Sequence, residues 1–362
     1  MRIGVDAREL AGRATGAGRY LAGLLHQWSA DDRARVHEFL LYAPEPLPLT
    51  LDARRFPTRE VRGPRGWRWE QIDVPRVAKG DHLDVWFAPA YTAPLRLSVP
   101  IVAAIHDISF VAHPEWFRIR EGVRRRWLTV RTARAARSIV TISEFTKREL
   151  MERLDTPAAK IDVIPPGVNH PPSSIRRQPL ADPTVLFVGS IFNRRHVPDL
   201  IRAFGSIARA HPDARLDIVG DNRSHPYENL RRTIEGEGLL TAVQWHEYVT
   251  DARLAELYAG ARAFAFLSEY EGLGLTPLEA LAAGVPSVLL DTAVARESCG
   301  DAALYAPAHD QAAVTRALEA LLFDESTRAR LLAAAPAVVS KYSWPRAARD
   351  TLKVLERAVL ES

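Results

Sequence analysis

Short apolar segments recur along this chain, and stretches of helical character lie between them. The first half contains "RIGVD", "EFLLYA", "DVWFAPA", "PIVAAIHD", "SIVTIS" and "KIDVIPP". The second half repeats the scheme with "TVLFVGS", "RLDIVG", "VQWHEY", "RAFAFLS", "PSVLL" and "AALYAP". Segments of this length that end at Gly, Pro, Asp or Ser are typical of strands buried in a parallel sheet. The alternation of strand and helix in both halves predicts an α/β fold with two doubly wound, Rossmann-like sheets.

A proline-rich segment at residues 164–183 separates the two halves. Its sequence, "IPPGVNHPPSSIRRQPLADP", interrupts helices and stiffens the connection. A chain of 362 residues also suits two domains rather than one core. We therefore expect an N-terminal domain over residues 1–170 and a C-terminal domain over residues 171–344. The last segment, "YSWPRAARDTLKVLERAVLES", has a helical pattern that could pack on either domain.

Composition and charge narrow the class of protein. A hydrophobic fraction of 47% and a charged fraction of 25% are typical of a folded globular protein. The net charge of +4 does not favour a nucleic-acid binder. Cys299 is the single cysteine, which excludes an intramolecular disulfide and a cysteine-built metal site and suits a reducing compartment. The N-terminus lacks a signal-peptide core and no segment reaches the roughly 18–20 apolar residues of a membrane span. We expect a cytoplasmic protein whose membrane contact is at most peripheral.

Glycines stand where a ligand would meet the first sheet, because ligands of open α/β sheets bind beyond the carboxyl ends of the strands. In "RATGAGRYLAGLL", Gly16 and Gly18 follow the first strand and introduce a helix. Glycine lets the backbone approach a phosphate, and helix N–H groups attract it, although a flexible turn would have the same sequence. Tyr20 and Leu21 stand near the place of the third glycine of a dinucleotide fingerprint, which disfavours a nicotinamide enzyme.

Two other strand ends carry polar residues. Arg194 and Arg195 follow the first strand of the second half, and paired guanidiniums suit a diphosphate. The alternative is a solvated basic turn. His106 and Asp107 end the strand in "AAIHDISF". This histidine could hydrogen-bond a substrate, although a structural histidine with satisfied partners is the commoner case.

The stretch "SEYEGLGLTPLEALAAG", residues 268–284, places Glu271 and Glu279 on either side of a Gly-Leu-Gly turn between a strand and a helix. We expect Thr276 as the helix N-cap, followed by a proline at the first helical position, and Gly284 as the helix stop. Thr276 and Glu279 would then form a capping box, which is the structural alternative to a ligand role for Glu279. A helix N-terminus flanked by two carboxylates could instead hold a diphosphate and the hydroxyls beside it, which describes a nucleotide sugar.

These motifs resemble those of the retaining glycosyltransferases of family 4, whose two-domain architecture is the GT-B fold. The resemblance covers nearly the whole chain. It is carried by the two glutamates and by "TGAGRY", "IHDISFVAHPEWF", "TISEFTKREL", "VIPPGVN" and "RRHVPDLIRAF", in the family's order and spacing. Three residues differ from the family pattern: Leu273 replaces an aromatic residue, Arg195 a lysine and His196 an asparagine.

The resemblance implies a role for each matching residue in binding a nucleotide-sugar donor. Glu279 would hold the ribose hydroxyls, and Glu271 would contact hydroxyls of the donor sugar near the reacting carbon. The diphosphate would be bound by Gly16, Arg194, Arg195 and the backbone N–H groups of Gly274, Leu275 and Thr276. His106 would face the donor sugar. Tyr248 and Val249 match the segment whose backbone reads the nucleobase.

The resemblance also implies the reaction. The C1–phosphate bond of the donor would break through an oxocarbenium-like state with net retention, and the arginines and the helix N-terminus would stabilise the leaving diphosphate, so that no metal or other cofactor is required. Residues 345–362 would cross back to the N-terminal domain, which would bind the acceptor. Closure of the two domains would exclude water from the donor.

The segment "RIREGVRRRWLTVRTARAARS", residues 118–138, carries Val123, Trp127 and Val130 at helical spacing among arginines. One interpretation is a solvated helix that packs by this apolar face. The other is a cationic surface for an anionic membrane or a lipid-diphosphate acceptor.

From the resemblance we expect a hexosyltransferase that moves mannose from GDP-mannose to a glycan, lipid-linked or small-molecule acceptor in polysaccharide, glycolipid or natural-product assembly. One alternative is a UDP-sugar or dTDP-rhamnose donor. The other is a non-catalytic nucleotide-sugar or nucleic-acid binding protein, against which the retained glutamates, the arginine pair and the modest charge argue.

Overall fold

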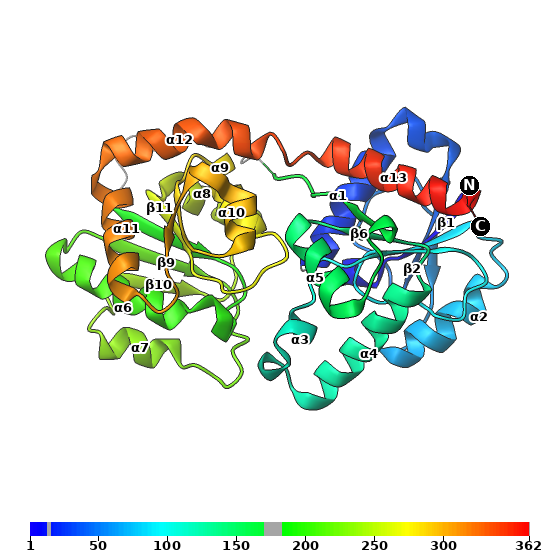
Figure 1. Ribbon diagram of the computed structural model, residues 1–362, viewed down its shortest axis with the longest axis horizontal. Helices are drawn as coiled ribbons and strands as arrows, with labels where there is room; N and C mark the ends of the chain where they lie inside the picture. The colour runs from blue at the N-terminus through cyan, green and yellow to red at the C-terminus, as the bar shows by residue number, and fades with distance from the viewer. Residues whose placement is uncertain (13–15, 170–182, 362) are drawn as a thin grey trace. The chain divides into compact units, whose positions relative to one another are not determined.

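The computed structural model describes residues 1–12, 16–169 and 183–361. The chain forms two compact units, one of Met1–Gly167 with Tyr342–Ser362 and one of Val168–Lys341. Each unit has its own parallel sheet with helices around it (Figure 1). Residues 13–15 of the predicted glycine loop and residues 170–182 of the predicted linker lie outside the described residues.

The first unit is built on a parallel sheet in the order β3-β2-β1-β4-β5-β6-β7. Its strands are β1 (Arg2–Asp6), β2 (Glu38–Ala43), β3 (Thr58–Glu60), β4 (Val85–Ala88), β5 (Ile101–Ala104), β6 (Ser138–Thr141) and β7 (Ile161–Val163). Each apolar segment of the first half forms one of these strands. The sequence "TRE" of β3 was not predicted, because a short polar strand at a sheet edge leaves no apolar run.

The helices of the first unit are α1 (Gly16–Ala30), α2 (Val74–Ala78), α3 (Ser109–Ala112), α4 (Ile119–Ala135), α5 (Glu144–Leu154) and α13 (Trp344–Leu360). The register of the sheet places Ile3 of β1 opposite Phe39 of β2 and Val85 of β4. These side chains are fully buried, as expected for a sheet covered on both faces.

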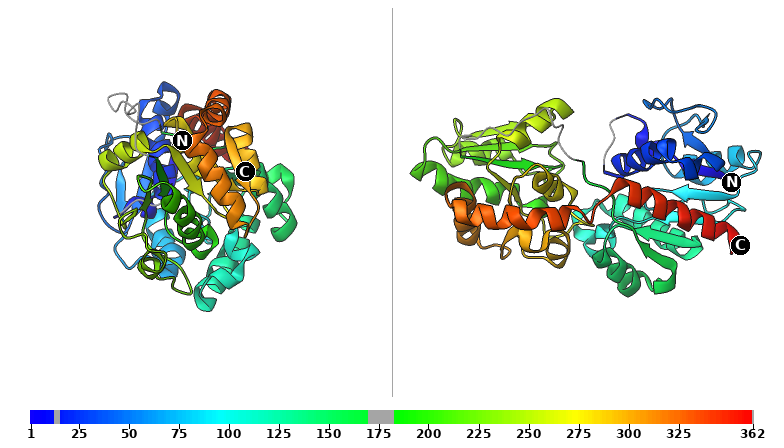
Figure 2. Two further views of the ribbon diagram at one scale, coloured as in Figure 1. Left: turned by 90° about the vertical axis from the view of Figure 1, so that its left-hand side faces the viewer. Right: turned by 90° about the horizontal axis from the view of Figure 1, so that it is seen from above.

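The C-terminal helix α13 packs beside α1 in the first unit, which decides a question that the sequence left open (Figures 1 and 2). The indole N–H of Trp28 donates to the carbonyl of Ala348 at 2.9 Å. A Cβ added to Gly23 would lie 2.5 Å from the Trp344 ring, and one added to Gly167 would lie 2.2 Å from it. The helix docks closely because two positions beneath Trp344 carry no side chain.

The second unit has a parallel sheet in the order β10-β9-β8-β11-β12-β13. Its strands are β8 (Thr184–Val188), β9 (Arg215–Val219), β10 (Val243–His246), β11 (Ala263–Phe266), β12 (Ser287–Leu290) and β13 (Ala303–Ala306). Its helices are α6 (Val197–Ala210), α7 (Leu230–Gly236), α8 (Asp251–Gly260), α9 (Leu275–Ala282), α10 (Ala293–Cys299), α11 (Gln311–Phe323) and α12 (Glu325–Val339). All six strands were predicted from their apolar runs. Among the described residues, the structure contains no helix whose length and apolar character would let it cross a membrane.

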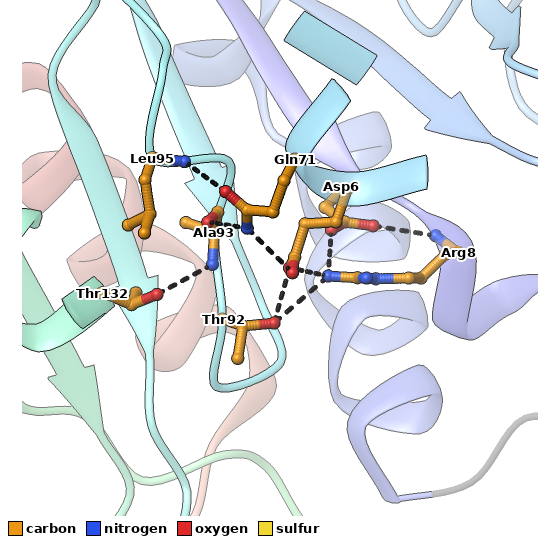
Figure 3. A network of polar contacts seen from close by, with 8 residues as sticks. Asp6, Arg8, Gln71, Thr92, Ala93, Leu95 and Thr132 are labelled. Carbon is orange, nitrogen blue, oxygen red and sulfur yellow. Dashed lines mark hydrogen bonds and ion pairs between the residues drawn. The ribbon is translucent and has the colours of Figure 1, made fainter. Parts of the chain in front are cut away.

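A buried polar network lies at the carboxyl end of β1 (Figure 3). Arg8 forms an ion pair with Asp6 at 2.8 Å and a second one with Glu70. Glu70 also accepts from the Thr92 hydroxyl at 2.5 Å and from the Gln71 amide at 3.1 Å. The side chains of Asp6 and Glu70 are 3% and 2% exposed, so one guanidinium is set against two carboxylates that have little access to water.

The network perturbs the ionisation of Asp6. Burial raises its pKa, the charge of Arg8 lowers it and the charge of Glu70 raises it again, which leaves the pKa at about 6 against an ordinary 3.8. Between these values the folded state binds a proton that the unfolded chain releases. The contribution of Asp6 to stability is therefore complete at low pH and declines as the pH rises from about 4 to 6.

We expect the substitution Asp6→Asn to remove this pH dependence, because an amide does not ionise. The free energy of unfolding of the variant minus that of the unsubstituted protein should rise by roughly 3 kcal/mol between pH 4 and pH 7. This value corresponds to a pKa shift of about two units. Urea unfolding across this range measures the difference. Asp155→Asn, at an exposed position, serves as the control. If the free energies of unfolding of Asp6→Asn and the unsubstituted protein differed by the same amount at every pH, the result would contradict the expectation.

Candidate active site

The two adjacent arginines of the second unit lie in a short 3₁₀ turn that follows β8. The guanidinium of Arg194 lies over the Phe192 ring at 4.3 Å, and that of Arg195 lies over the Phe266 ring at 4.9 Å. Arg195 also donates from Nη1 to the carbonyl of Ser190 at 2.7 Å. A Cβ on Gly189, whose φ is +148°, would lie 2.8 Å from that Nη1 atom. The turn therefore fixes the Arg195 guanidinium between aromatic faces and the backbone.

Glu271 is the partner of Arg195. Its Oε1 atom accepts from Arg195 Nε at 2.8 Å and from the Ser268 hydroxyl at 2.8 Å. The two side chains are only 13% and 17% exposed. The backbone N–H of Glu269 donates to the Arg194 carbonyl at 2.9 Å, which joins the loop after β11 to the turn after β8. Because these bonds of Glu271 use Oε1, its Oε2 atom is available to a ligand.

The environment keeps Glu271 ionised. Burial raises its pKa, but the charges of Arg195 and Arg194 and the hydrogen bonds from Arg195 and Ser268 outweigh burial and bring the pKa below its ordinary value. An ionised carboxylate accepts hydrogen bonds and donates none. In this state Glu271 can bind a ligand hydroxyl but repels a ligand anion.

The helix α9 begins earlier than the sequence indicated. Gly274 is its N-cap, in the left-handed conformation at φ +86°, and Leu275 is the first helical residue. The prediction of Thr276 as N-cap, with a capping box to Glu279, is therefore wrong, and the proline occupies the third helical position rather than the first. The physical reason is that a glycine can adopt a left-handed turn into the helix, so the chain turns before Thr276 is reached. The first N–H groups of α9 have no partner within the helix.

Glu279 lies one turn into α9 and is partly buried. Its Oε2 atom accepts from the Tyr258 hydroxyl at 3.4 Å. Tyr258 belongs to α8, so this contact joins two neighbouring helices of the second unit. Tyr248 and Val249 lie in the connection between β10 and α8, where Tyr248 is 64% exposed and Val249 is partly buried.

In the first unit, Gly16 begins α1, and a Cβ added to it would meet no atom of the described part of the chain within 4 Å. The position therefore leaves room for a group that approaches the start of the helix. The residues just before it, 13–15, lie outside the described part of the chain.

His106 follows β5 and is buried. Its Nε2 atom lies 2.8 Å from the Pro89 carbonyl, and the rings of Tyr20 and Tyr91 pack edge-on against it. Burial lowers its pKa more than the Pro89 carbonyl and the charge of Asp107 raise it. A neutral ring must place its proton on Nε2, since a carbonyl only accepts, and Nδ1 is then an acceptor. His106 thus has both a structural bond and a nitrogen that can accept from a ligand hydroxyl.

Asp107 has structural partners. It accepts from the Tyr91 hydroxyl at 2.8 Å and from the hydroxyl and backbone N–H of Ser109 at 2.6 and 2.9 Å. Arg125 of α4 stacks over the Tyr91 ring at 4.6 Å. Together these contacts fix the loop after β5 that carries His106.

The helix α4 does not pack by the face that the sequence suggested. Val123 and Trp127 are 51% and 49% exposed, and Val130 is partly buried. The buried face carries Leu128, Thr129, Thr132 and Ala133 instead. Expectation and structure differ because the inner face includes Thr132, whose hydroxyl accepts a hydrogen bond from the Ala93 N–H at 3.1 Å and joins the helix to the loop after β4. Val123 and Trp127 therefore lie on the outer face, among arginines.

The structure thus brings together Arg194, Arg195 and Glu271 and holds them by direct contacts. Asp6, Arg8 and Glu70 of the first-unit network were not singled out from the sequence. Asp6 and Arg8 follow the first apolar run, so the rule that polar residues after strands carry function could have found them. Glu70 lies in a helical turn, Trp69–Asp73, and has no such signal.

Comparison with known proteins agrees with this architecture. The family described as Glycosyltransferase Family 4 matches residues 14–170, and that described as Glycosyl transferases group 1 matches residues 173–338. The O-antigen chain mannosyltransferase B of Escherichia coli is 27% identical over 335 residues, 89% of this chain and 84% of that protein. The phosphatidyl-myo-inositol mannosyltransferase of Mycobacterium leprae is 30% identical over 265 residues, 71% of this chain and 67% of that protein.

Solved structures share the fold at lower identity. The sucrose-phosphate synthase from Thermosynechococcus elongatus has a TM-score of 0.81 at 17% identity, with 100% of both chains covered. The Anabaena protein HepE, in complex with UDP and glucose, has a TM-score of 0.76 at 19% identity, with 99% of this chain and 100% of that chain covered. Two family models spanning most of the sequence, a 30% identical relative and these folds lead to one conclusion. The chain belongs to glycosyltransferase family 4, with the GT-B fold, and is a retaining hexosyltransferase that uses nucleotide-sugar donors.

Proposed function

We propose that this glycosyltransferase moves a mannosyl group from GDP-mannose to a hydroxyl of a glycan, glycolipid or natural-product acceptor. The observation that carries the site assignment is the Arg195–Glu271 contact at 2.8 Å, which sets a phosphate-binding cation beside a hydroxyl-binding anion. The choice of mannose is supported by two relatives that are named mannosyltransferases, at 27% and 30% identity.

In this proposal the second unit, Val168–Lys341, which we expected from the sequence over residues 171–344, binds the donor. Arg194, Arg195 and the first N–H groups of α9, at Gly274, Leu275 and Thr276, receive the diphosphate. Glu279 accepts from the ribose hydroxyls and Glu271 from hydroxyls of the sugar, while Tyr248 and Val249 line the base. Arg195 supports this assignment, because its Nε and Nη1 atoms are held by protein partners and its Nη2 atom remains for a phosphate oxygen.

The first unit, Met1–Gly167 with Tyr342–Ser362, which we expected from the sequence over residues 1–170 and 345–362, binds the acceptor. Gly16 admits the diphosphate at the start of α1, and His106 accepts from a hydroxyl of the donor sugar through Nδ1. The neutral state of His106 supports this role, because an acceptor nitrogen suits a hydroxyl.

The transfer breaks the bond between C1 and the phosphate oxygen, and its electron pair goes to that oxygen. The acceptor hydroxyl bonds to C1 on the same face, and its proton passes to the leaving phosphate. The charge that develops on the nucleoside diphosphate is stabilised by Arg194, Arg195 and the α9 N-terminus, so that the proposed step requires no metal ion.

A second candidate is a UDP-sugar donor, or the related dTDP-rhamnose. The HepE structure, which shares the fold, contains UDP and glucose. The residues assigned above contact phosphate, ribose and sugar hydroxyls, which all these donors share. The base and the sugar therefore need a direct measurement.

We expect one nucleoside diphosphate out of GDP, UDP, ADP and dTDP to raise the melting temperature of the protein in metal-free buffer, and we expect it to be GDP. A ligand at about 100 times its dissociation constant stabilises the folded state by roughly 2.7 kcal/mol. Glu279→Ala should abolish the shift, and Glu235→Ala, at an exposed position on α7, should retain it. A shift by UDP alone would replace the GDP assignment. An unchanged shift in Glu279→Ala would remove the ribose role.

We expect Glu271→Gln to separate binding from transfer. The amide keeps the shape of the side chain but loses the charge that contacts the donor sugar, so kcat/KM for transfer should fall by about 100-fold or more. The dissociation constant of GDP should change by less than about tenfold. Release of GDP from GDP-mannose over a panel of glycan and lipid-diphosphate acceptors measures transfer, with Glu235→Gln as the control. An equal loss of binding and transfer would overturn the assigned role.

We also propose that α4 contacts an anionic membrane or a lipid-diphosphate acceptor. Its outer face presents Val123 and Trp127 together with exposed arginines at positions 124, 126, 131 and 134. Each basic residue near an anionic surface contributes about 1 kcal/mol, and a tryptophan at such a surface adds apolar burial.

Vesicle sedimentation tests this surface. We expect binding to vesicles of phosphatidylglycerol with phosphatidylcholine, weaker binding in high salt, and none to phosphatidylcholine alone. The double substitution of Val123 and Trp127 by Ser should weaken binding by about tenfold or more, while Val36→Ser, at a position that is 75% exposed in the same unit, should not. Equal binding of both variants, or no salt-sensitive binding, would show that α4 is only a solvated helix.

A further inference from the structure

Three side chains from separate loops of the second unit converge beside the arginine turn. They are His196 at the start of α6, Glu269 after β11 and His309 after β13. One ligand atom from each, an imidazole nitrogen or a carboxylate oxygen, lies within 4.8 Å of the other two. Glu269 Oε1 lies 2.8 Å from His196 Nε2 and 3.7 Å from His309 Nε2. None of the three residues has a role in the proposed donor site.

The contact between His196 and Glu269 is not an ordinary hydrogen bond. Nε2 of His196 is a buried atom that makes no hydrogen bond with any residue the structure describes, although the Glu269 oxygen is 2.8 Å away. The oxygen must therefore lie off the direction in which a ring N–H would point. Two ligands of one metal ion stand in this relation, since each lone pair points at the ion and not at the other ligand.

The other nitrogen of His196 has the partner that a metal-binding histidine usually has. Its Nδ1 atom lies 3.2 Å from Oδ2 of Asp199, one turn along α6. A carboxylate in this place holds the proton on Nδ1 and leaves the Nε2 lone pair free for a metal. The side chains of His196 and Glu269 are 20% and 31% exposed, while His309 is 73% exposed, so the site is open to solvent on the His309 side.

The geometry points to a binding site for one divalent transition-metal ion, Zn²⁺ by preference, held by His196 Nε2, Glu269 Oε1 and His309 Nε2. Zinc binds imidazole nitrogen and carboxylate oxygen at about 2.0–2.2 Å, which sets its ligand atoms about 3.3 Å apart in a tetrahedron. The separations of Glu269 Oε1 from the two histidine nitrogens, 2.8 and 3.7 Å, bracket this value, and water can supply the fourth ligand. Two imidazoles favour Zn²⁺, Co²⁺ or Ni²⁺ over Mg²⁺, which prefers oxygen ligands.

The site has a structural consequence for its surroundings. His196 directly follows Arg195, and Glu269 is joined to Arg194 through a backbone hydrogen bond of 2.9 Å. His309 precedes α11, which packs against α6. A bound ion would therefore connect the turn of the two arginines, the loop of Glu271 and the start of α11. The ion takes no part in the transfer step.

Metal binding is measured on the full chain, with any affinity tag removed and the protein freed of metal by a chelator. We expect one Zn²⁺ per chain in a titration against a chromophoric chelator at neutral pH, and visible absorption bands of tetrahedral Co²⁺ with the same stoichiometry. His309→Ala and Glu269→Gln should each weaken Zn²⁺ binding by at least about 100-fold, because each removes one of the three protein ligands. Asp199→Asn should weaken it by about 10- to 100-fold through the orientation of His196.

The control is His26→Ala, which removes an exposed histidine of the first unit and should leave binding unchanged. His309 is mostly exposed, so its replacement should not disturb the fold, and circular dichroism checks this. A chain that binds no Zn²⁺ stoichiometrically would overturn the proposal. Binding that survives both His309→Ala and Glu269→Gln would do the same. These measurements need no donor or acceptor, so they remain valid whatever sugar the enzyme transfers.

Discussion

The candidate active site depends on the partly buried ion pair between Arg195 and Glu271. Such a pair loses hydration when it is sheltered from water, and its mutual attraction offsets this only if other bonds complete the geometry. Here the Ser190 carbonyl and the Ser268 hydroxyl do so, and the Phe266 ring covers the guanidinium. The net contribution of the pair to the free energy of unfolding is therefore small, but the pair fixes the loop after β8 against the loop after β11. The roles proposed for Arg195 and Glu271 depend on that fixed geometry.

The fold could be predicted from the sequence because its information is local. Each buried strand is a short apolar run, and all twelve such runs form strands. The predictions that were missed or wrong concern features that depend on contacts with distant parts of the chain or on backbone conformation. The edge strand β3 is polar and forms only because β2 offers it a partner. The start of α9 depends on a left-handed glycine, and the buried face of α4 includes Thr132, whose hydrogen-bond partner, the Ala93 N–H, lies on a distant loop.

The site could be predicted only in part, for a related reason. Arg194, Arg195 and Glu271 lie in the loops that follow β8 and β11, and parallel strands bring their carboxyl ends to one edge, so sequence position implied proximity. The network around Arg8 includes Glu70, which lies far along the chain and follows no strand. The cluster of His196, Glu269 and His309 could be predicted only if the positions of three separate loops were known together. Contacts of this kind depend on side-chain directions that a pattern of apolar residues does not contain.

The charge state of the site constrains what it can accept. Glu271 is kept ionised by the two arginines, so its remaining oxygen can only accept hydrogen bonds. His106, held neutral by burial and bonded through Nε2 to a carbonyl, also presents an acceptor. In the proposed donor arrangement, both groups would meet hydroxyls of the sugar, and neither could bind a carboxylate. A neutral hexose therefore suits these two residues, whereas a uronic acid would set its anion against the ionised Glu271 carboxylate. In that arrangement, the arginines that would attract the donor phosphates would also make Glu271 select against a charged sugar.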